Sequence, residues 1–167
     1  MPAGEMLATA LDSIIRIEKE ITGQERKEYW TKKLELFTKE PNALVATVEK
    51  SNDNEGYSAI HVCLNDKNMM VAAEADGKLC GFMFGHIKEG EFGSGADSGW
   101  MEILGVDPSF QGKGIGKHMA NTFSEQLTKM GINTIYTLVN WQDTKLIPYF
   151  TSLGFARADF MALQKEL

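Results

Sequence analysis

The chain has 167 residues, a length that fits one domain, expected here to span residues 1–167. Apolar residues make up 43% and charged residues 24%, as in ordinary globular proteins, and no run of 18 or more apolar residues is present. A net charge of −6 argues against nucleic-acid binding, which needs a basic surface, and is compatible with a cationic substrate. We therefore expect neither a nucleic-acid nor a membrane partner.

The N-terminal residues and the cysteines bear on the compartment. The opening stretch, MPAGEMLATALDSII, has no basic region ahead of an apolar core, so no signal peptide is expected. Cys63 and Cys80 each lie inside an apolar run, which indicates two buried small side chains rather than a disulfide or a metal pair. A cytoplasmic protein is the expectation from both features.

The N-terminal third begins with two predicted helices. Residues 8–21 carry an apolar stripe at helical spacing and are followed by Gly23, while residues 24–39 form a second helix that Pro41 limits. Residues 41–67 contain two apolar runs around a polar loop, which fit either strands or irregular cover.

A β-rich region follows in the middle of the chain. Residues 68–87 are two strand-like runs separated by Asp76-Gly77, a dipeptide typical of hairpin turns. Residues 89–99 contain four glycines and form a loop, and residues 100–106 form a further strand that ends at Asp107-Pro108.

The last third alternates between helices and strands. A helix of about 15 residues begins near Gly116, residues 133–139 form a strand, and residues 143–155 form a short helix. Asp143 is its expected N-cap, Pro148 implies a kink or a late start, and FMALQKEL is expected to form a final strand. This order predicts an α/β protein with a mixed sheet.

The stretch VDPSFQGKGIGKHMA has glycine at three alternate positions, where a strand passes into a helix. The first turn of a helix has amide groups without partners, and glycines let an anion approach them. Two lysines in the stretch add positive charge to an acidic protein. The alternative is a glycine-rich turn with solvated lysines. The pattern indicates a phosphate site at Gly112, Lys113, Gly114, Gly116 and Lys117.

Two common phosphate loops do not match this stretch. A Walker A loop would need Ser or Thr after Lys117, where the chain has His118, and the dinucleotide fingerprint needs a different glycine spacing. The pattern Q-x-x-G-x-G in ILGVDPSFQGKGIGKHMANTF resembles motif A of the GNAT superfamily of N-acetyltransferases, and YFTSLGF resembles the end of motif B. The resemblance covers residues 68–167 well, whereas residues 41–67 look like an insertion that is atypical of the family.

The resemblance implies a fold and a co-substrate. The expected fold is a GNAT-like mixed, mostly antiparallel sheet flanked by helices, with two strands splayed apart at the cofactor site. The co-substrate would be acetyl-CoA, with its pyrophosphate on the loop amides and its pantetheine along the preceding strand. The residues so assigned are Leu104, Gly105, Val106, Gln111, Gly112, Lys113, Gly114, Ile115, Gly116, Lys117, Asp143 and Phe150. Gly105 would mark a bulge that splays the strands, or would serve close packing, and Asp143 would reach pantetheine or only cap its helix.

Acetyl transfer to an amine needs a base, because removing the proton from an ammonium group with a pKa of about 10.4 costs about 4.6 kcal/mol of free energy at pH 7. Glu102 is the candidate, since strand alternation would place Trp100, Glu102 and Leu104 on one face and family members often carry an acid on this strand. The alternative is a structural or solvent-facing carboxylate. Asp97 and Glu91 are weaker candidates that would instead grip a cationic substrate.

An acid must then protonate the leaving thiolate. Phe150 stands where the family usually has its tyrosine, so the neighbouring Tyr149 is the candidate, with packing as its alternative role. If Tyr149 does not donate this proton, water or Tyr136 would donate it. No metal site is expected from His61, His86 and His118, and Trp30, Trp100 and Trp141 are expected to pack in the core rather than line the acceptor pocket.

Taken together, the residues and the resemblance predict an acetyl-CoA-dependent N-acetyltransferase. It would act on a primary amine, either a protein N-terminus, a lysine, or a small amine such as a polyamine, with a homodimer as a possible assembly. Two other functions remain open at this point: a non-catalytic acyl-CoA-binding regulatory module and a nucleotide-binding protein.

Overall fold

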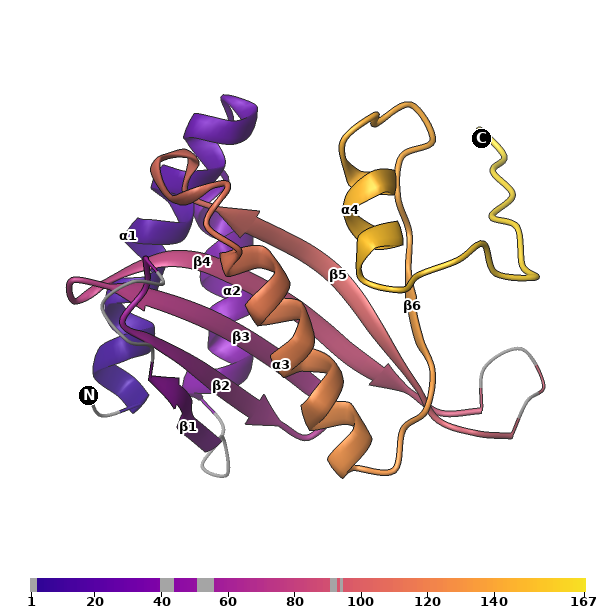
Figure 1. The fold of residues 1–167 in the computed structure, drawn as a ribbon, viewed down its shortest axis with the longest axis horizontal. Helices are drawn as coiled ribbons and strands as arrows, with labels where there is room; N and C mark the ends of the chain where they lie inside the picture. The colour runs from indigo at the N-terminus through magenta and orange to yellow at the C-terminus, as the bar shows by residue number, and fades with distance from the viewer. Residues whose placement is uncertain (1–2, 40–43, 51–55, 91–92, 94) are drawn as a thin grey trace.

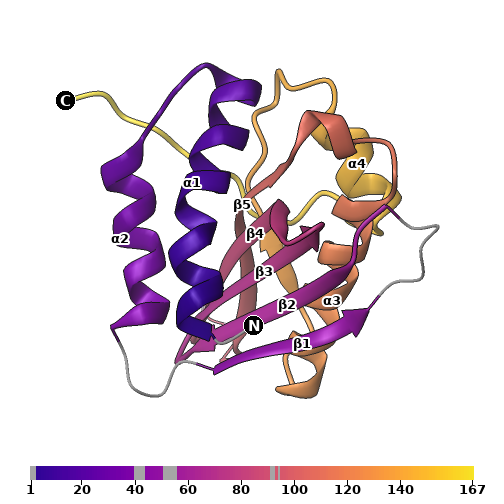
Figure 2. The same cartoon turned by 90° about the vertical axis from the view of Figure 1, so that its left-hand side faces the viewer.

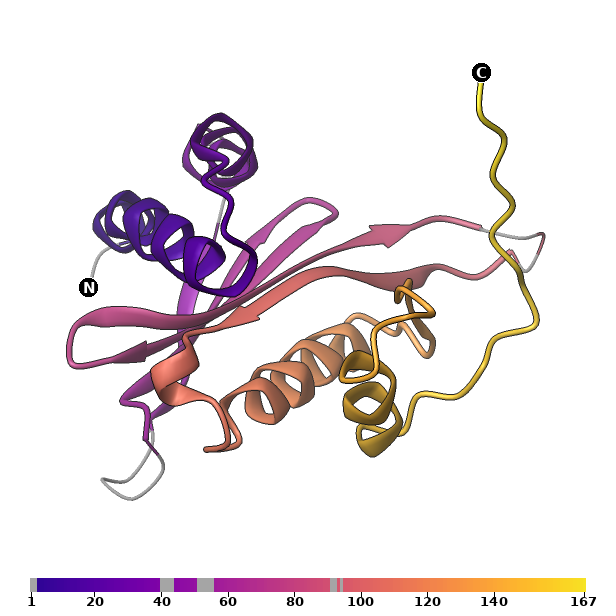
Figure 3. The same cartoon turned by 90° about the horizontal axis from the view of Figure 1, so that it is seen from above.

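A computed structural model describes residues 3–39, 44–50, 56–90, 93 and 95–167. Six strands form one sheet in the order β1-β2-β3-β4-β5-β6 (Figure 1). The first five pair antiparallel, and β5 pairs with β6 in parallel, so the predicted mixed, mostly antiparallel sheet is confirmed. Helices α1 and α2 cover one face, and α3 and α4 cover the other (Figure 3).

On the first face, helix α1 is a few residues longer than predicted, and helix α2 is a few residues shorter. Helix α1 spans Ala3–Thr22 and α2 spans Lys27–Thr38, and they lie side by side (Figure 2). The buried carboxylate of Glu18 accepts hydrogen bonds from the Arg26 amide at 3.1 Å and from Trp30 Nε1 at 2.8 Å. This carboxylate therefore connects α1 to the start of α2 and fixes the turn between them.

The segment for which either strands or irregular cover was expected contributes two strands to the sheet. Strand β1 spans Leu44–Lys50 and β2 spans Ala59–Asn65, and β2 is buried along most of its length. Residues 40–43 and 51–55 of this segment lie outside the described residues. Because β2 pairs with β3 along seven residue pairs, this part of the chain is integral to the sheet.

The predicted hairpin is confirmed. Strand β3 spans Asn68–Ala75 and β4 spans Lys78–Lys88, with Ala75 opposite Lys78. Asp76 and Gly77 both have positive φ, 51° and 76°, as a two-residue turn of type I′ requires.

Strand β5, Ser98–Val106, contains a bulge that the sequence did not reveal. Phe84 pairs with Ile103 and Gly85 with Met101, so Glu102 is the extra residue. The expectation that Glu102 and Leu104 share a face is therefore wrong. Glu102 bonds to Lys33 of α2, whereas Leu104 packs with the cluster under α3 and α4.

The expectation of a bulge at Gly105 is also wrong. Gly105 is in register with Phe82, and a Cβ at this position would lie 2.7 Å from the Phe82 ring. Glycine is needed there because the ring leaves no room for a side chain.

The second face begins with α3, Ile115–Lys129, which buries Met119, Phe123 and Leu127 against the sheet. Strand β6 is short, Ile135–Thr137, and α4 spans Leu146–Ser152. The late start of α4 places Pro148 in its first turn, where the missing amide of proline costs no hydrogen bond. Among the described residues, no helix combines the length and apolar character needed to cross a bilayer.

The predicted final strand is absent. Residues 156–167 carry no helix or strand and are exposed throughout (Figure 1). The apolar content of FMALQKEL favours a strand locally, but a strand also needs a neighbour to accept its hydrogen bonds. This segment leaves the body of its own chain instead of pairing with β6.

Candidate functional site

The glycine loop has the geometry of an anion site. After β5 the chain forms a short turn, η2 (Pro108–Phe110), and α3 begins directly after Gly114. Gly112 and Gly114 both have φ of 80°, a left-handed conformation that side chains disfavour. The helical hydrogen bonds start with the amide of His118, which donates to Gly114 O at 3.0 Å. The amides of residues 115–117 form the first turn, where helices bind anions.

Electrostatics favour an anion at the same place. The first turn of α3 contains no acidic residue and no side-chain cap, while the exposed Lys113 precedes it and the exposed Lys117 lies within it. The positive end of the helix dipole adds to these charges.

Two further residues meet near the loop, since the Tyr57 hydroxyl lies 3.3 Å from His118 Nδ1. The sequence did not predict this contact, because Tyr57 and His118 lie far apart in the chain.

Gly116 has a different role from the other two glycines. A Cβ at Gly116 would lie 3.3 Å from the hydroxyl oxygen of Tyr149, and this hydroxyl donates to Gly116 O at 2.8 Å. Gly116 therefore lets α4 approach the start of α3. Burial raises the pKa of Tyr149 to about 12, so its hydroxyl stays protonated at neutral pH.

A cavity of about 220 Å³ opens where β5 and β6 separate. Strand β6 pairs with residues 99–101 of β5, and beyond Met101 the two strands diverge, which confirms the predicted splayed pair. Walls come from both strands and from α4: Met101, Glu102, Ile103, Leu104, Thr137, Leu138, Leu146 and Phe150. The cavity thus joins the predicted base, Glu102, to predicted cofactor residues Leu104 and Phe150.

Glu102 lies in an ion-pair network that the sequence did not predict. One carboxylate oxygen bonds to Lys33 Nζ of α2, and the other bonds to His86 Nδ1 of β4. An ionised carboxylate can only accept, so the His86 ring donates from Nδ1. The His86 ring lies parallel to the Trp100 ring, with their centroids 6.5 Å apart.

The protonation state of Glu102 follows from these partners. Burial raises the pKa of Glu102, but the hydrogen bonds and charges of Lys33 and His86 outweigh it and hold the pKa below its ordinary value. The carboxylate is therefore ionised throughout the neutral range. It can attract a cationic amine and orient His86, and both of its oxygens already have a partner.

The structure also shows the surroundings of two further residues that were predicted to contact the cofactor. Asp143 was expected to be the N-cap of α4, but Lys145 has that position. Asp143 Oδ1 accepts from the amides of Lys145 at 2.9 Å and Leu146 at 3.0 Å, so it holds the turn that leads into α4, and these bonds lower its pKa. Gln111 Nε2 donates to Val106 O at 3.2 Å, which ties the loop to the end of β5.

Of the tryptophans expected in the core, Trp30 is buried, but Trp141 is 82% exposed, so the expected place of Trp141 is wrong. Glu91 lies outside the described residues.

Asp107 connects the loop to α1. Its side chain is 5% exposed and accepts from the Ser109 amide at 2.9 Å and from Arg16 at 2.8 Å. Burial raises the pKa of Asp107, but the Ser109 bonds and the Arg16 charge outweigh it and lower the pKa. Because the pKa of Asp107 is lower in the folded state than in the unfolded state, its ionised form stabilises the fold at pH values above the unfolded-state pKa. This stabilisation is lost as the pH falls through the folded-state pKa.

Asp107→Asn is expected to reduce the free energy of unfolding by about 2 kcal/mol at pH 7, because a buried charged hydrogen-bond acceptor is lost. The difference from wild type should shrink as the pH falls below the ordinary aspartate pKa of about 3.9 towards the lowered pKa of folded Asp107. Urea unfolding at pH 7, 5 and 3 measures it, with the exposed Asp12→Asn as the matched control on α1. A difference that stays constant down to pH 3 would contradict the role of the Asp107 charge.

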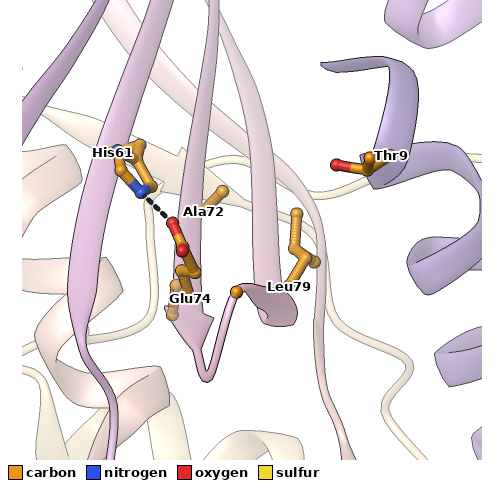
Figure 4. Close-up of a pocket in the computed structure, with 7 residues that line it drawn as sticks. Thr9, His61, Ala72, Glu74 and Leu79 are labelled. Carbon is orange, nitrogen blue, oxygen red and sulfur yellow. Dashed lines mark hydrogen bonds and ion pairs between the residues drawn. The ribbon is translucent and has the colours of Figure 1, made fainter. Parts of the chain in front are cut away.

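A second hollow lies at the α1 face of the sheet (Figure 4). Its volume is about 10 Å³, enough for a water molecule but not for a substrate. His61 Nε2 bonds Glu74 at 2.7 Å and His61 Nδ1 lies 2.9 Å from Thr47 Oγ1, so both ring nitrogens have partners. Within the described ranges, no group of three potential ligands is arranged to hold a metal ion.

The two cysteines are buried as predicted, at 0% and 2% exposure for Cys63 and Cys80. Burial raises the pKa of Cys63 to about 12 and that of Cys80 to about 11, so neither is a reactive thiol at neutral pH.

Curated proteins of known activity resemble about half of the chain. A mycothiol acetyltransferase of Renibacterium salmoninarum is 31% identical over 90 residues, covering 54% of this chain and 26% of that protein. One of Nocardioides is 29% identical over 97 residues, covering 54% of this chain and 33% of that protein. The chain thus spans about a quarter to a third of the length of these curated relatives.

Solved structures share the fold. Aminoglycoside N-acetyltransferase AAC(6')-Iy, solved in complex with CoA, superposes with a TM-score of 0.68 at 16% identity and covers 95% of this chain and 90% of its own. A possible acetyltransferase from Clostridium difficile reaches 0.69 at 15% identity and covers 99% and 94%. The model of the acetyltransferase (GNAT) family matches residues 24–155, which include the sheet, the glycine loop and α4. The resemblance seen in the glycine loop is thereby confirmed, and the chain belongs to the acetyltransferase (GNAT) family.

Proposed function

We propose that this protein transfers the acetyl group of acetyl-CoA to a primary amine of a small molecule. The observation that carries the proposal is the cavity between β5 and β6. Glu102, Leu104 and Leu146 line it, and β5 leads along the chain into the loop that presents the first-turn amides of α3. An anion on these amides would place an attached thioester arm along the free edge of β5, in line with Glu102.

A small-molecule acceptor is supported by the relatives. Those compared above are named for mycothiol, and structural neighbours of the same fold are named for aminoglycosides. The net charge of −6 fits a cationic acceptor. Near Glu102, the partly exposed residue Trp100 lies parallel to His86 and supplies aromatic surface for the body of the acceptor.

The amine must lose a proton before it attacks. Both oxygens of Glu102 are hydrogen-bonded, so we assign proton acceptance to His86, with Glu102 holding the imidazole by Nδ1 and leaving Nε2 as the acceptor. The His86 side chain is 24% exposed, which leaves it accessible to an amine. Lys33 keeps Glu102 ionised.

The chemical step follows from these positions. His86 takes one proton from the ammonium group and releases it to water. The neutral amine nitrogen then forms a bond to the thioester carbon, and its second proton passes to His86. The resulting oxyanion is stabilised by backbone amides at the free edge of β5. The carbon–sulfur bond then breaks, which yields the acetylated amine and a CoA thiolate, and a proton donor completes free CoA. Tyr149 lies beside the loop and is our candidate donor.

Tyr149→Phe is expected to lower kcat by about tenfold to a hundredfold, because the thiolate loses its donor, and to change the Kd for CoA by less than about threefold. Steady-state kinetics and isothermal titration calorimetry measure the two quantities. Tyr136→Phe, which alters the other candidate tyrosine, should leave kcat within about twofold. If Tyr136→Phe lowers kcat and Tyr149→Phe does not, the donor is Tyr136 and Tyr149 only joins α4 to α3.

Purified protein with acetyl-CoA and a panel of amines tests the proposed function. The panel includes aminoglycosides, amino sugars, polyamines, and peptides with a free N-terminus or lysine. Release of free thiol with a small-molecule amine, together with mass-spectrometric detection of the acetylated product, is the expected result. Turnover of peptides alone would contradict the small-molecule acceptor. Tight CoA binding without turnover of any amine would favour the non-catalytic acyl-CoA-binding module.

A further inference from the structure

Lys33 places a primary amine of the chain itself beside the cavity between β5 and β6. Its side chain extends from α2, and its Nζ bonds to the carboxylate of Glu102, which lines that cavity. Under the proposed function, the same carboxylate attracts the amine of the acceptor. Lys33 therefore holds its amine at the position that an acceptor amine would take.

Aromatic side chains fix the position of the Lys33 amine. Its Nζ lies 5.6 Å from the centroid of the Phe84 ring on β4 and 5.9 Å from that of the Tyr29 ring on α2. Both distances are within the range of cation–π contacts. The Lys33 side chain is 18% exposed, so its amine has few positions open to it other than beside Glu102. A nucleophile held in this way reacts without the entropy cost of a bimolecular encounter.

A thioester bound along β5 would lie next to this amine. This step rests on the proposed function, in which the pyrophosphate binds at the start of α3 and the thioester arm follows the free edge of β5. Four consecutive residues of β5, from Met101 to Leu104, line the cavity, and Glu102 is one of them. A thioester in the cavity and the amine held by Glu102 would thus meet at adjacent residues of one strand.

Other lysines have different surroundings. Lys113 precedes the first turn of α3 and Lys117 lies within it, so both would meet the phosphates of the co-substrate rather than its thioester. Lys32 is the neighbour of Lys33 on α2, but its side chain is 72% exposed and pairs with Glu28 at 3.2 Å. Lys32 therefore provides a lysine on the same helix that does not contact the cavity lining.

We propose that bound acetyl-CoA acetylates Lys33 of the same chain, which makes Lys33 a modification site. The Lys33 ammonium group gives one proton to Glu102, which passes it to water. The neutral nitrogen then forms a bond to the thioester carbon, the carbon–sulfur bond breaks, and the electron pair leaves with the sulfur. The second proton of the nitrogen passes through water to the thiolate. The products are acetylated Lys33, free CoA and one proton in solution.

The rate of this reaction is limited by the base. The Lys33 and His86 partners hold the pKa of Glu102 below its ordinary value, so Glu102 is a weak acceptor for a lysine proton. We therefore expect slow transfer that stops after one acetyl group per chain. A small amine that is a good acceptor should slow the modification, because it competes with Lys33 for Glu102.

Incubation of the full chain with acetyl-CoA alone tests the proposal. Intact-mass spectrometry is expected to show one added acetyl group, and peptide mapping should locate it on Lys33. The first-order rate constant should stay the same when the protein concentration is changed, because the transfer occurs within one chain. Lys33→Arg keeps the positive charge beside Glu102 but removes the nucleophile, and it should lower acetyl incorporation at least about twentyfold.

Two further variants serve as controls. Lys32→Arg is matched to Lys33→Arg and should leave acetyl incorporation within about twofold. Gly114→Asp, which is expected to impair the binding of acetyl-CoA, should lower acetylation of Lys33 at least about tenfold and leave the slow chemical acetylation of Lys32 unchanged. Circular dichroism melting confirms that each variant folds.

Three results would overturn the proposal. The first is a chain that binds acetyl-CoA and leaves Lys33 unmodified. The second is a rate constant that rises with protein concentration, which would show transfer between chains. The third is equal acetylation of Lys33 in the Gly114→Asp variant, which would show chemical acetylation outside the site.

The proposed function is judged by a different result. Turnover of a small amine without acetylation of Lys33 would contradict only the modification of Lys33. Acetylation of Lys33 without turnover of any small amine would support the modification and contradict only the small-molecule acceptor.

Discussion

Gly114→Asp should weaken binding of acetyl-CoA at least a hundredfold, as measured by isothermal titration calorimetry. Two effects act in the same direction. Gly114 has φ of 80°, so a side chain strains the backbone at the start of α3. The added carboxylate would also lie next to the first-turn amides, where it would repel a pyrophosphate and compete with it for these donors.

Gly131→Asp is the matched control for this change. Gly131 follows the other end of α3, also has φ of 80°, and has open space around its Cβ position. Backbone strain is therefore the same in both variants, and only the Gly114 variant places charge at the loop. If the Gly131 variant loses CoA affinity equally, the loss reflects strain and not the anion site. Unchanged affinity in the Gly114 variant would remove the loop from the binding site.

Glu102→Gln should lower kcat/KM for the amine by about a hundredfold to a thousandfold, within the range that general acid–base catalysis supplies. The amide cannot neutralise Lys33, and it no longer offers His86 a charged acceptor, so the imidazole loses its fixed orientation. CoA binding depends on the loop, so the Kd for CoA should change less than about threefold. Kinetics at saturating acetyl-CoA, with calorimetry for CoA, separate the two effects.

Glu89→Gln provides the matched control for Glu102→Gln. Glu89 also pairs with a lysine, Lys67 at 2.7 Å, and this pair lowers its pKa, but it lies outside the cavity lining. Its substitution should leave kcat/KM within about twofold. If Glu102→Gln retains full activity, Glu102 is a structural carboxylate that joins α2 to the sheet, and another group prepares the amine.

Several elements could be predicted because their signals are local. Asp76-Gly77 predicted a hairpin, since few residues accept two successive positive φ angles. Glycines before α3 predicted the loop that passes into this helix for a related reason, and Asp143 predicted the turn at the start of α4, although Lys145 is the N-cap. In each case the backbone conformation depends on a few adjacent residues.

Other expectations failed where the answer depends on distant parts of the chain. The bulge at Glu102 arises from the pairing of β5 with β4, and a bulge shifts every later side chain to the opposite face. Gly105 was expected to mark a bulge or to serve close packing, and the Phe82 ring of the neighbouring strand supports close packing. Trp141 was expected in the core, yet no local pattern tells whether an aromatic side chain finds a covering partner.

The sequence by itself determined the hairpin, the loop that passes into α3 and, through their motifs, the family. These depend on backbone preferences and spacing that neighbouring residues set. Only the tertiary structure decided that Glu102 meets Lys33 and His86, that Gly116 makes room for Tyr149, and that residues 156–167 do not pair with β6 of their own chain. The reason is physical: such contacts join residues far apart in the chain, and their geometry follows from strand register and helix packing.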